Sequence, residues 1–546
     1  MDVLSTVSLV ALVVGVLLSL VTVVVLARPG GRWGTLVRSR LVLGVPWGTL
    51  IAVALVAAFY LFVQDGLANP RRPVVVPFRA WSYFYPTGIL TAGFAHSSFG
   101  HVTGNLLGTL VFGSLAEYAW SHFPKRRGSS TFSSLRTNPY ARILAWVGGV
   151  FVVGVTSSLF ALGPVIGFSG VVFAFVGFAL VRFPLATLAT VLVSRVVTQV
   201  YNAMLSPMLT QRAGETTFSR PWWSEIAIQG HALGLFIGVV LAVAVFYRRG
   251  VRPKPQHVWL AALVFAVDRG LWAVYTIEGG ETYRLFRALG TGLVFVVAAL
   301  IAAGATASPR PLIERIDLSR REAAVGLVLA VLFALALVAV PFNLFVVDDP
   351  SAGLDDAEPV EVGDYTVFYA EDVSHQFIPA VPLPGTNETN GQVTASGVIV
   401  VSEQRNLWWE EVSSSRLATS RQATIRLGGV TWNEDVRATR ETWNVAGGES
   451  TYNVRLGLAS ADDRPVVFRA DRATADARID GRNVSIEPVN ETFDVVVTRE
   501  NETIDRAELP TDGNSTTVGG LTVERVDRNL FVERGETRVR IAQRSG

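Results

Sequence analysis

The sequence predicts a polytopic α-helical membrane protein that continues into an all-β domain of sandwich type. Half of the 546 residues are hydrophobic and 17% are charged, whereas about 25% of residues are charged in an ordinary soluble domain. Apolar runs near the ~20 residues that cross a bilayer recur up to residue 347. From Asp348 onward, short β-prone runs alternate with Gly, Asn and Asp clusters. The net charge of +2 combines a basic, apolar part with an acidic, polar part.

Ten apolar runs are expected to span the membrane as helices. The first run is not a typical secretory signal, because Asp2 is the only charge near its start and the run is longer than a signal h-region. The fifth and sixth runs are joined by a very tight turn at Arg182 and Pro184. The runs cover residues 5–27, 43–63, 102–121, 142–162, 167–183, 185–203, 229–247, 258–277, 286–306 and 323–347.

Basic residues between the runs predict the orientation, because they gather on the cytoplasmic face of a membrane protein. They follow the first, third, seventh and ninth runs, which places all of them on one face. The N-terminus and everything after residue 347 are then outside, so the β domain is expected to be extracellular at the cell membrane. The residues are Arg28, Arg32, Arg38, Arg40, Lys125, Arg126, Arg127, Arg136, Arg142, Arg248, Arg249, Arg252, Lys254, Arg310, Arg315, Arg320 and Arg321.

Glycosylation signals agree with this orientation. Five Asn-x-Ser/Thr acceptors occur, and all lie in the segment that is expected to be outside, at Asn387, Asn483, Asn490, Asn501 and Asn514. The lack of lysine in this segment, together with many arginines and acids, resembles proteins of high-salt archaea. His375 is the segment's only histidine, and we expect a surface residue there rather than a ligand.

Several classes of function are excluded. The chain has no cysteine, so it holds no disulfide scaffold, thiolate zinc site or cysteine nucleophile. Nucleic-acid binding is disfavoured, because the basic residues lie between apolar segments rather than in one patch. No His-Glu-x-x-His motif suggests a zinc protease. Asp268 is the only acid well inside an expected span that has a free carboxylate and no obvious partner, which argues against an aspartyl protease.

Three polar groups near the outer leaflet carry the candidate chemistry, because polar groups in a membrane span are costly. His101 and Asn105, four residues apart, lie on one helix face at the start of the third run. Ser169 lies in a Gly167-Phe-Ser-Gly170 sequence at the start of the fifth run, and His231 opens the seventh. Each has a simpler interpretation: the glycines allow close helix packing, and the histidines and asparagine join helices by hydrogen bonds. Their joint occurrence at one depth favours catalysis.

The chemistry of acyl transfer asks for these residue types. A serine hydroxyl becomes nucleophilic when a base takes its proton, and a neutral imidazole suits that task. Ser169 and His231 therefore form a candidate dyad that needs no acidic third member. The oxyanion needs hydrogen-bond donors, and the candidates are the Ser169 backbone N–H, the Asn105 amide and the His101 ring. Gly167 and Gly170 leave room for a substrate backbone and for the neighbouring helix.

Residues 43–247 resemble the rhomboid family of intramembrane serine proteases. The resemblance rests on His101-x-x-x-Asn105, Gly167-x-Ser169-Gly170, and His231 followed by Gly234 and Gly238, with Thr91–His96 before the first pair and Gly113 and Glu117 after it. It implies that Ser169 is the nucleophile, that His231 is the base, that Asn105 and His101 line the oxyanion hole, and that His96 is structural. It also implies a core of six helices that begins in the cytoplasm, with cleavage near the outer leaflet after small residues.

The expected organisation has four parts. Residues 1–42 add a helix and a basic cytoplasmic loop, 43–250 form the rhomboid-like core, 251–347 add three helices, and 348–546 form the acidic β domain. The expected activity is cleavage of transmembrane protein substrates within the lipid bilayer, with no metal or other cofactor.

Two alternatives remain open. The first is a catalytically silent rhomboid-like scaffold that binds transmembrane clients, although such proteins usually lose the serine or the histidine. The second is a transporter with a glycosylated outer domain, which would show charged or helix-breaking residues near mid-membrane in paired halves. The sequence shows no such internal symmetry.

Overall fold

The computed structural model describes residues 3–28, 30–123, 129–204, 221–223, 226–277, 283–313, 316–344, 352–354, 357–376, 394–500 and 502–545. The described residues form two compact units, one helical within residues 1–346 and one of strands within residues 347–546.

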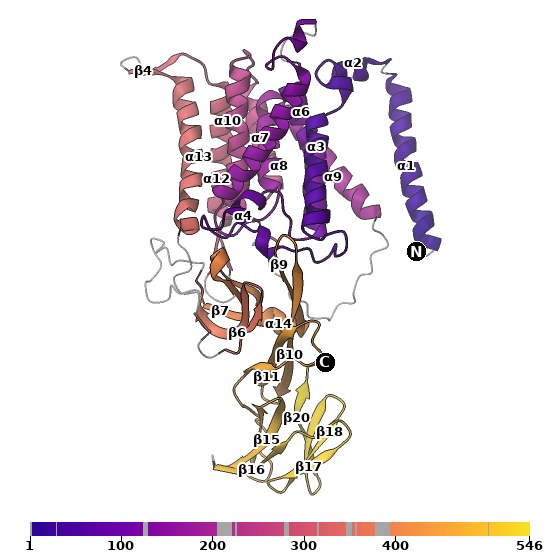
Figure 1. Cartoon of the computed structure of the whole chain (residues 1–546), viewed down its shortest axis with the longest axis vertical. Coiled ribbons are helices and arrows are strands. Elements are labelled where there is room, and N and C mark those ends of the chain that lie inside the picture. Colours follow the sequence, from indigo (N-terminus) through magenta and orange to yellow (C-terminus); the bar gives the residue numbers. More distant parts are fainter. Residues whose placement is uncertain are drawn as a thin grey trace. The chain divides into compact units, whose positions relative to one another are not determined.

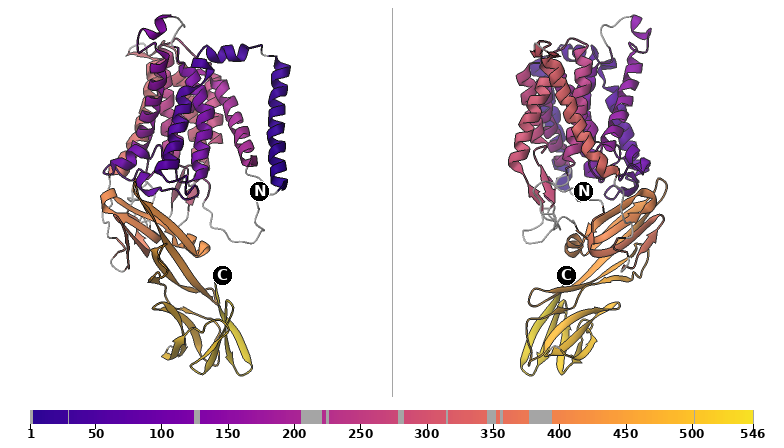
Figure 2. Two further views of the ribbon diagram at one scale, coloured as in Figure 1. Left: turned by 45° about the vertical axis from the view of Figure 1, so that its right-hand side comes forward. Right: turned by 90° about the vertical axis from the view of Figure 1, so that its left-hand side faces the viewer.

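The helical unit contains a helix in each of the ten apolar runs (Figure 1). α1 stands to one side of the other helices (Figure 2), and none of its most apolar window is buried. The helices are α1 (Val3–Ala27), α2 (Arg32–Arg38), α3 (Trp47–Ala58), α4 (Pro86–Thr91), α5 (Phe99–Gly108), α6 (Ser114–Trp120), α7 (Pro139–Leu159), α8 (Ser169–Arg182), α9 (Pro184–Met204), α10 (Ile228–Tyr247), α11 (Pro255–Asp268), α12 (Arg287–Thr306) and α13 (Arg320–Leu344).

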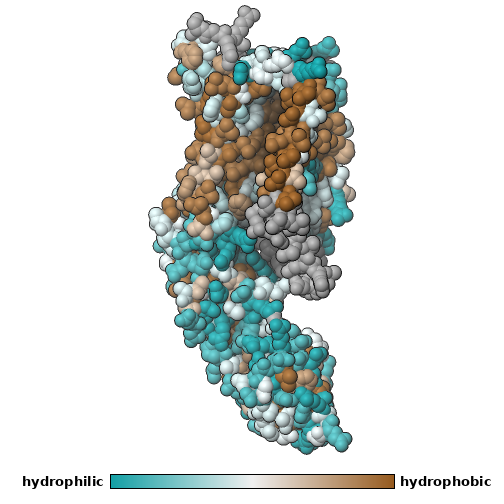
Figure 3. Space-filling view, turned by 90° about the vertical axis from the view of Figure 1, so that its right-hand side faces the viewer, coloured by the Kyte–Doolittle hydropathy of each residue, from teal (hydrophilic) through white to brown (hydrophobic). Residues whose placement is uncertain are grey.

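Among the described residues, six helices are long and apolar enough, by length and composition, to cross a membrane: α1, α7, α9, α10, α12 and α13. Two further runs combine helices with π-helical turns. α3 continues into Phe59–Val63, and Thr109–Gly113 joins α5 to α6. Figure 3 shows mainly hydrophobic side chains over the helices. The chain is therefore a multi-pass membrane protein.

The eighth run is shorter than expected. α11 ends at Asp268, and Gly270 follows with a φ of +70° that ends the helix. The expectation that Asp268 lacks a partner is wrong, because its carboxylate accepts from Arg195 Nε at 2.9 Å and lies 3.1 Å from Arg269 Nε. A carboxylate in an apolar bundle is stabilised by such pairing, and Arg195 lies 73 residues away in α9.

α8 forms the centre of the helical core. Every residue from Gly170 to Val181 is buried, as expected of a helix that is apolar on all sides. α8 has 14 residues, which at 1.5 Å per residue spans roughly 21 Å. The neighbouring helices α7 and α10 are longer, with 21 and 20 residues. Ser169 is the first residue of α8 and therefore lies at one end of this core helix.

The second unit consists of antiparallel sheets. One sheet has the order β5-β6-β7-β8, one β13-β14-β15-β16, and one β12-β11-β10-β20-β19-β18-β17 with β9 also paired to β10. The elements are β5 (Val360–Val362), β6 (Tyr365–Ser374), β7 (Thr394–Ser402), β8 (Leu407–Ser413), α14 (Ser414–Ser420), β9 (Gln422–Gly428), β10 (Asn433–Val445), β11 (Ser450–Leu458), β12 (Val466–Arg469), β13 (Ala473–Thr474), β14 (Asn483–Val489), β15 (Thr492–Arg499), β16 (Glu502–Glu508), β17 (Ser515–Val518), β18 (Leu521–Val526), β19 (Asn529–Arg534) and β20 (Thr537–Arg544).

Two of these sheets face each other as a sandwich. Val484 and Val495 from the β13–β16 sheet share one buried cluster with Val523, Val532 and Ile541 from the largest sheet. A second cluster lies on the β5–β8 sheet around Phe368, Ile399 and Trp408. The predicted all-β domain is therefore confirmed, and its described residues include these two hydrophobic clusters.

His375 differs from the surface residue that we expected. Its ring is partly buried, with its centroid 5.1 Å from that of Trp408 and 5.9 Å from that of Trp409. Burial lowers the pKa of His375 to about 4. The imidazole is therefore neutral near pH 7 and packs as an aromatic side chain.

Candidate active site

Glycines hold α8 and α10 close together. A Cβ on Gly234 would lie 2.2 Å from the carbonyl oxygen of Gly170, and one on Gly238 would lie 2.0 Å from that of Ala174. On the facing helix, a Cβ on Gly177 would lie 2.2 Å from the Leu235 carbonyl oxygen. Small residues of this kind allow membrane helices to pack backbone against backbone. The first turn of α8 consequently lies beside the first turn of α10.

This packing brings Ser169 and His231 into hydrogen-bond contact. Ser169 Oγ lies 2.8 Å from His231 Nε2, although the two residues are 62 positions apart. The Phe173 ring, one turn after Ser169, stacks on the imidazole with centroids 4.2 Å apart and planes 13° apart. His231 Nδ1 has no hydrogen-bond partner among the described residues. The pair is thus a two-membered arrangement whose imidazole is oriented by stacking.

α5 presents His101 and Asn105 to the segment that precedes the serine. A Cβ on Gly167 would lie 2.7 Å from His101 Nε2 and 3.7 Å from Asn105 Nδ2, and the φ of Gly167 is +133°. Both contact and conformation therefore require glycine there. Asn105 is 9% exposed, and its Nδ2 has no partner among the described residues. This amide donor lies near Gly167, two residues before the serine.

His101 and His96 adopt different environments. His101 Nδ1 lies 3.1 Å from Ser97 Oγ, which leaves its Nε2 on the Gly167 side. His96 is fully buried, and its Nε2 accepts a long hydrogen bond of 3.5 Å from the Phe168 backbone N–H. The Gln64 side chain accepts from the His96 N–H and donates to the His96 carbonyl, each at 2.8 Å. His96 thus links the serine segment to the loop after α3.

The loop before Ser169 is held by side chains from two other helices. Gln229, two residues before His231, accepts from the Leu162 N–H at 2.9 Å and donates to the Phe160 carbonyl at 2.9 Å. Asn343 of α13 donates to the carbonyls of Leu159 and Ala161 at 3.3 and 3.0 Å. A Cβ on Gly170 would lie 2.8 Å from that of Ser157. The lack of a side chain at Gly170 therefore also allows α8 to pack closely against α7.

A buried carboxylate fixes the helix that continues from α5. Glu117 of α6 accepts from the backbone N–H groups of Gly48 and Thr49 at 2.8 and 2.7 Å, and lies 2.6 Å from His122 Nε2. Glu117 and His122 are fully buried. Acceptors at the first turn of a helix satisfy N–H groups that have no partner inside it. Glu117 therefore connects α6 to the start of α3. In the same interface, a Cβ on Gly113 would lie 3.0 Å from Thr49 Cγ2.

Phe173, Gln64, Gln229 and Asn343 were not expected from the sequence. Phe173 had a readable signal, because a residue four positions after Ser169 lies on the same helix face. The other three act through contacts to residues between 32 and 184 positions away. No periodicity or motif in one sequence indicates such partners.

The predicted glycosylation acceptors lie in different settings. Asn387 and Asn501 fall outside the described residues. Asn490 and Asn514 are exposed, whereas Asn483 begins β14 and is partly buried.

Among the described residues, no group of three or more His, Asp or Glu side chains is arranged to hold a metal ion.

Comparison with known proteins identifies the class of the helical core. Residues 83–248 match the family model of the Rhomboid domain, so the chain contains a rhomboid domain. This segment holds the His101–Asn105 pair, Ser169 and His231, and it confirms the resemblance to the rhomboid family. No curated protein and no solved structure shows significant similarity to the chain.

Proposed function

We propose that this protein is an intramembrane serine endopeptidase that cleaves transmembrane protein substrates with a Ser169–His231 dyad. The observation that carries the proposal is the 2.8 Å contact between Ser169 Oγ and His231 Nε2. It is the contact that a general base needs in order to take the proton of a nucleophilic hydroxyl. Polar groups are costly to place inside a membrane and therefore usually mark functional sites. This supports a functional rather than an incidental pair.

In the proposed reaction, Ser169 Oγ attacks the carbonyl carbon of the scissile peptide while His231 Nε2 accepts the hydroxyl proton. The oxyanion of the tetrahedral intermediate receives hydrogen bonds from Asn105 Nδ2, the His101 ring and the Ser169 backbone N–H. His231 then gives its proton to the leaving amine, and the acyl–serine ester remains. Water, activated by His231, hydrolyses the ester and restores Ser169.

Ser169 is well placed for this role because it is the first residue of α8. The N–H groups of a helix's first turn have no intrahelical acceptor, and the helix dipole favours negative charge there. The supporting groups Gly167, Gly170, His96 and Gly234 set the backbone geometry through the contacts described above. No metal or cofactor takes part in these steps.

We further propose that the protein lies in the cell membrane with the acidic β domain outside the cell. Basic residues lie in the connections after α1, before α7 and after α10. Under the positive-inside rule, these connections support the proposed orientation. Residues 43–250 are then the catalytic core, residues 1–42 and 251–347 are membrane additions, and 348–546 form the extracellular domain. The exposed sequons at Asn490 and Asn514 are candidate glycosylation sites on it.

The test is cleavage of a labelled transmembrane substrate panel by the full chain in proteoliposomes. The proposal expects cleavage by the wild type and loss of it to background in Ser169→Ala and His231→Ala. Ser39→Ala, a change to an exposed serine, is the matched control and should cleave normally. If wild type cuts no substrate while all variants bind them equally, the non-catalytic scaffold replaces the protease.

A further inference from the structure

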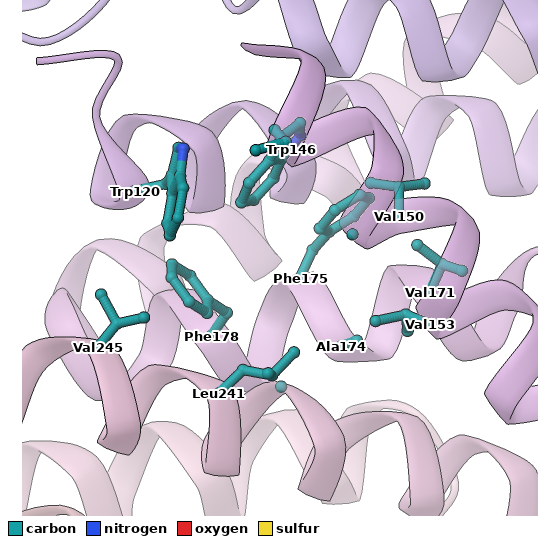
Figure 4. A pocket seen from close by; sticks show the side chains of 13 residues that line it. Trp120, Trp146, Val150, Val153, Val171, Ala174, Phe175, Phe178, Leu241 and Val245 are labelled. Carbon is teal, nitrogen blue, oxygen red and sulfur yellow. The ribbon is translucent and has the colours of Figure 1, made fainter. Parts of the chain in front are cut away.

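An apolar groove lies between α7, α8 and α10, with α6 at one end. Figure 4 shows its lining, from Val153 and Val171 at one end to Trp120 and Val245 at the other. On α8 the lining includes Val171, which lies roughly 200° around the helix from Ser169 at 3.6 residues per turn. The groove is therefore separate from the candidate active site.

The groove opens to the surface of the helical unit. Ala145, Gly149 and Leu241 line it and are exposed, with Leu241 46% accessible. In a multi-pass membrane protein this surface faces lipid, so the groove is open to the hydrocarbon of the bilayer. Its occupant must therefore come from the membrane.

The volume of the groove selects a thin occupant. The cavity measures about 220 Å³, while an apolar cavity of ~150 Å³ is sufficient to bind a benzene molecule. A helix with its side chains is about 10 Å across and does not enter a space of this size. A single acyl chain fits, and the lining residues offer it only apolar and aromatic contacts.

Two arginines stand at one end of the groove. The guanidinium carbons of Arg142 and Arg249 lie 4.4 and 5.8 Å from the centroid of the Trp120 ring. Both donate to carbonyls at the C-terminal end of α6. Arg142 Nη2 donates to the carbonyl of Ser121, the residue after the helix, at 3.0 Å, and Arg249 Nη1 to that of Trp120 at 3.0 Å. They are thereby held in place beside the ring that also forms the wall of the groove.

The positive charges of these two arginines are not paired with a carboxylate among the described residues. In the part of the chain that the structure describes, neither has a carboxylate within 4.0 Å. Arg142 Nη1 and Arg249 Nη2 make no hydrogen bond there, although an arginine carries five N–H donors. Arg40, which donates to the Tyr118 carbonyl at 3.3 Å, adds a third positive charge at this helix end. Guanidinium groups with free donors match the oxygens of a phosphate.

We propose that the groove binds one acyl chain of an anionic phospholipid, with the phosphate of its headgroup at Arg142 and Arg249. Lipid tails are as apolar as leucine, so burial alone does not favour this site over the surrounding bilayer. Packing against Trp120, Trp146 and Phe178 and the charge of the headgroup must together supply the preference. Basic pockets between membrane helices on the cytoplasmic side bind anionic headgroups in this way.

The experiment uses the purified full chain in detergent, titrated with dioleoyl phosphatidylglycerol and read by native mass spectrometry. Gly149→Leu fills the groove, and Gly148→Leu is its matched control on the same helix. A Cβ at either position meets nothing within 4 Å, so both variants should fold, and only Gly149 lines the groove. We expect Gly149→Leu to bind phosphatidylglycerol at least roughly ten-fold more weakly than Gly148→Leu and wild type.

Two further arms separate the parts of the ligand. Dioleoylglycerol, which has the same chains without a phosphate, should bind wild type roughly ten-fold more weakly than phosphatidylglycerol. Inorganic phosphate should not displace the lipid. Quenching of Trp120 is an independent readout. The Trp120 emission is the difference in fluorescence between wild type and Trp120→Phe, and phosphatidylglycerol with brominated chains should quench it.

The proposal is overturned if Gly149→Leu and Gly148→Leu retain the lipid equally, or if brominated chains leave the Trp120 fluorescence unchanged. Equal binding of dioleoylglycerol would overturn the role of Arg142 and Arg249. Displacement of the lipid by a transmembrane peptide from the wild type, but not from Gly149→Leu, would instead make the groove a protein-docking surface. If Gly149→Leu does not fold, Ala145→Phe, at an exposed lining residue, replaces it.

Discussion

A buried amide donor without a partner costs roughly 1–3 kcal/mol, and Asn105 carries one. Its Nδ2 has no hydrogen-bond acceptor among the described residues, and it lies near Gly167 in the segment before Ser169. In the proposed reaction the missing acceptor is the oxyanion, which exists only during turnover. Asn105 Nδ2 then gains its hydrogen bond only when the oxyanion forms. An interaction that is stronger in the transition state than in the ground state accelerates the reaction.

We therefore expect Asn105→Ala to lower kcat by about 10²–10³-fold with little change in KM, as for the loss of one oxyanion donor. The measurement is steady-state cleavage of a labelled transmembrane substrate. Thr103→Ala, at a half-buried residue of the same helix, serves as the control, because among the described residues the Thr103 hydroxyl bonds only to α5 carbonyls. Equal rates for the two variants would remove Asn105 from the oxyanion hole.

His375 makes the second unit sensitive to acid. Its pKa is about 4 in the folded chain and ~6.5 when unfolded. The unfolded state therefore binds more protons between these values, so stability is complete above pH ~6.5 and falls as the pH drops toward 4. The loss is at most roughly 3 kcal/mol. Hydrogen exchange of β8 peptides in the full chain should show it.

The control for this effect is His375→Phe, which keeps an aromatic ring between Trp408 and Trp409 but does not titrate. Carboxylates also titrate in this range, so the relevant quantity is the difference between wild type and variant. If protection of β8 falls with pH by the same amount in both proteins, His375 does not carry the effect.

At the level of whole elements, the pairing of α8 with α10 sets the distance between the two dyad residues. Replacing glycine by alanine inside a helix gains up to ~1 kcal/mol from propensity alone. At Gly238, however, the new Cβ would lie 2.0 Å from a backbone oxygen of α8, and no side-chain rotation relieves such a contact. Overpacking costs about 1–3 kcal/mol, so the clash outweighs the propensity gain.

Gly238→Ala should consequently destabilise the helical unit by roughly 1–2 kcal/mol and reduce cleavage, because α10 also carries His231. Gly292→Ala in α12, where a Cβ meets nothing within 4 Å, should be neutral or stabilising. Thermal unfolding in detergent and the cleavage rate measure the two effects. A Gly238→Ala protein as stable and active as Gly292→Ala would contradict the close approach of α8 and α10.

The elements also show what a single sequence can predict. Hydropathy and breaker residues located a helix in all ten runs, because bilayer thickness dictates the length of apolar segments. They missed the early end of α11, where ion pairs with Arg195 and Arg269 satisfy Asp268. Ser169 and His231 were recognisable from residue type and depth, whereas Gln229 and Asn343 were not. Their roles depend on tertiary contacts that leave no local pattern.

At the scale of the whole molecule, charge divides the chain. The connections between membrane helices are rich in arginine, while the segment after residue 347 is acidic and carries every Asn-x-Ser/Thr sequon. Under the positive-inside rule, basic connections stay in the cytoplasm. In the proposed orientation, the ten spans, an even number, place the β domain on the same side of the membrane as the N-terminus.

The chain has no cysteine, so single introduced cysteines report this topology without background. Thr517→Cys is at an exposed position of the second unit, and Ser39→Cys is at an exposed position of the basic connection after α1. We expect a membrane-impermeant maleimide to label Thr517→Cys on intact cells, and to label Ser39→Cys only after the membrane is permeabilised. The opposite pattern would invert the proposed orientation and place the dyad end of α8 toward the cytoplasm. Because Ser169 begins α8 and Arg182 ends it, the same two measurements decide from which side of the membrane water and substrate reach the serine.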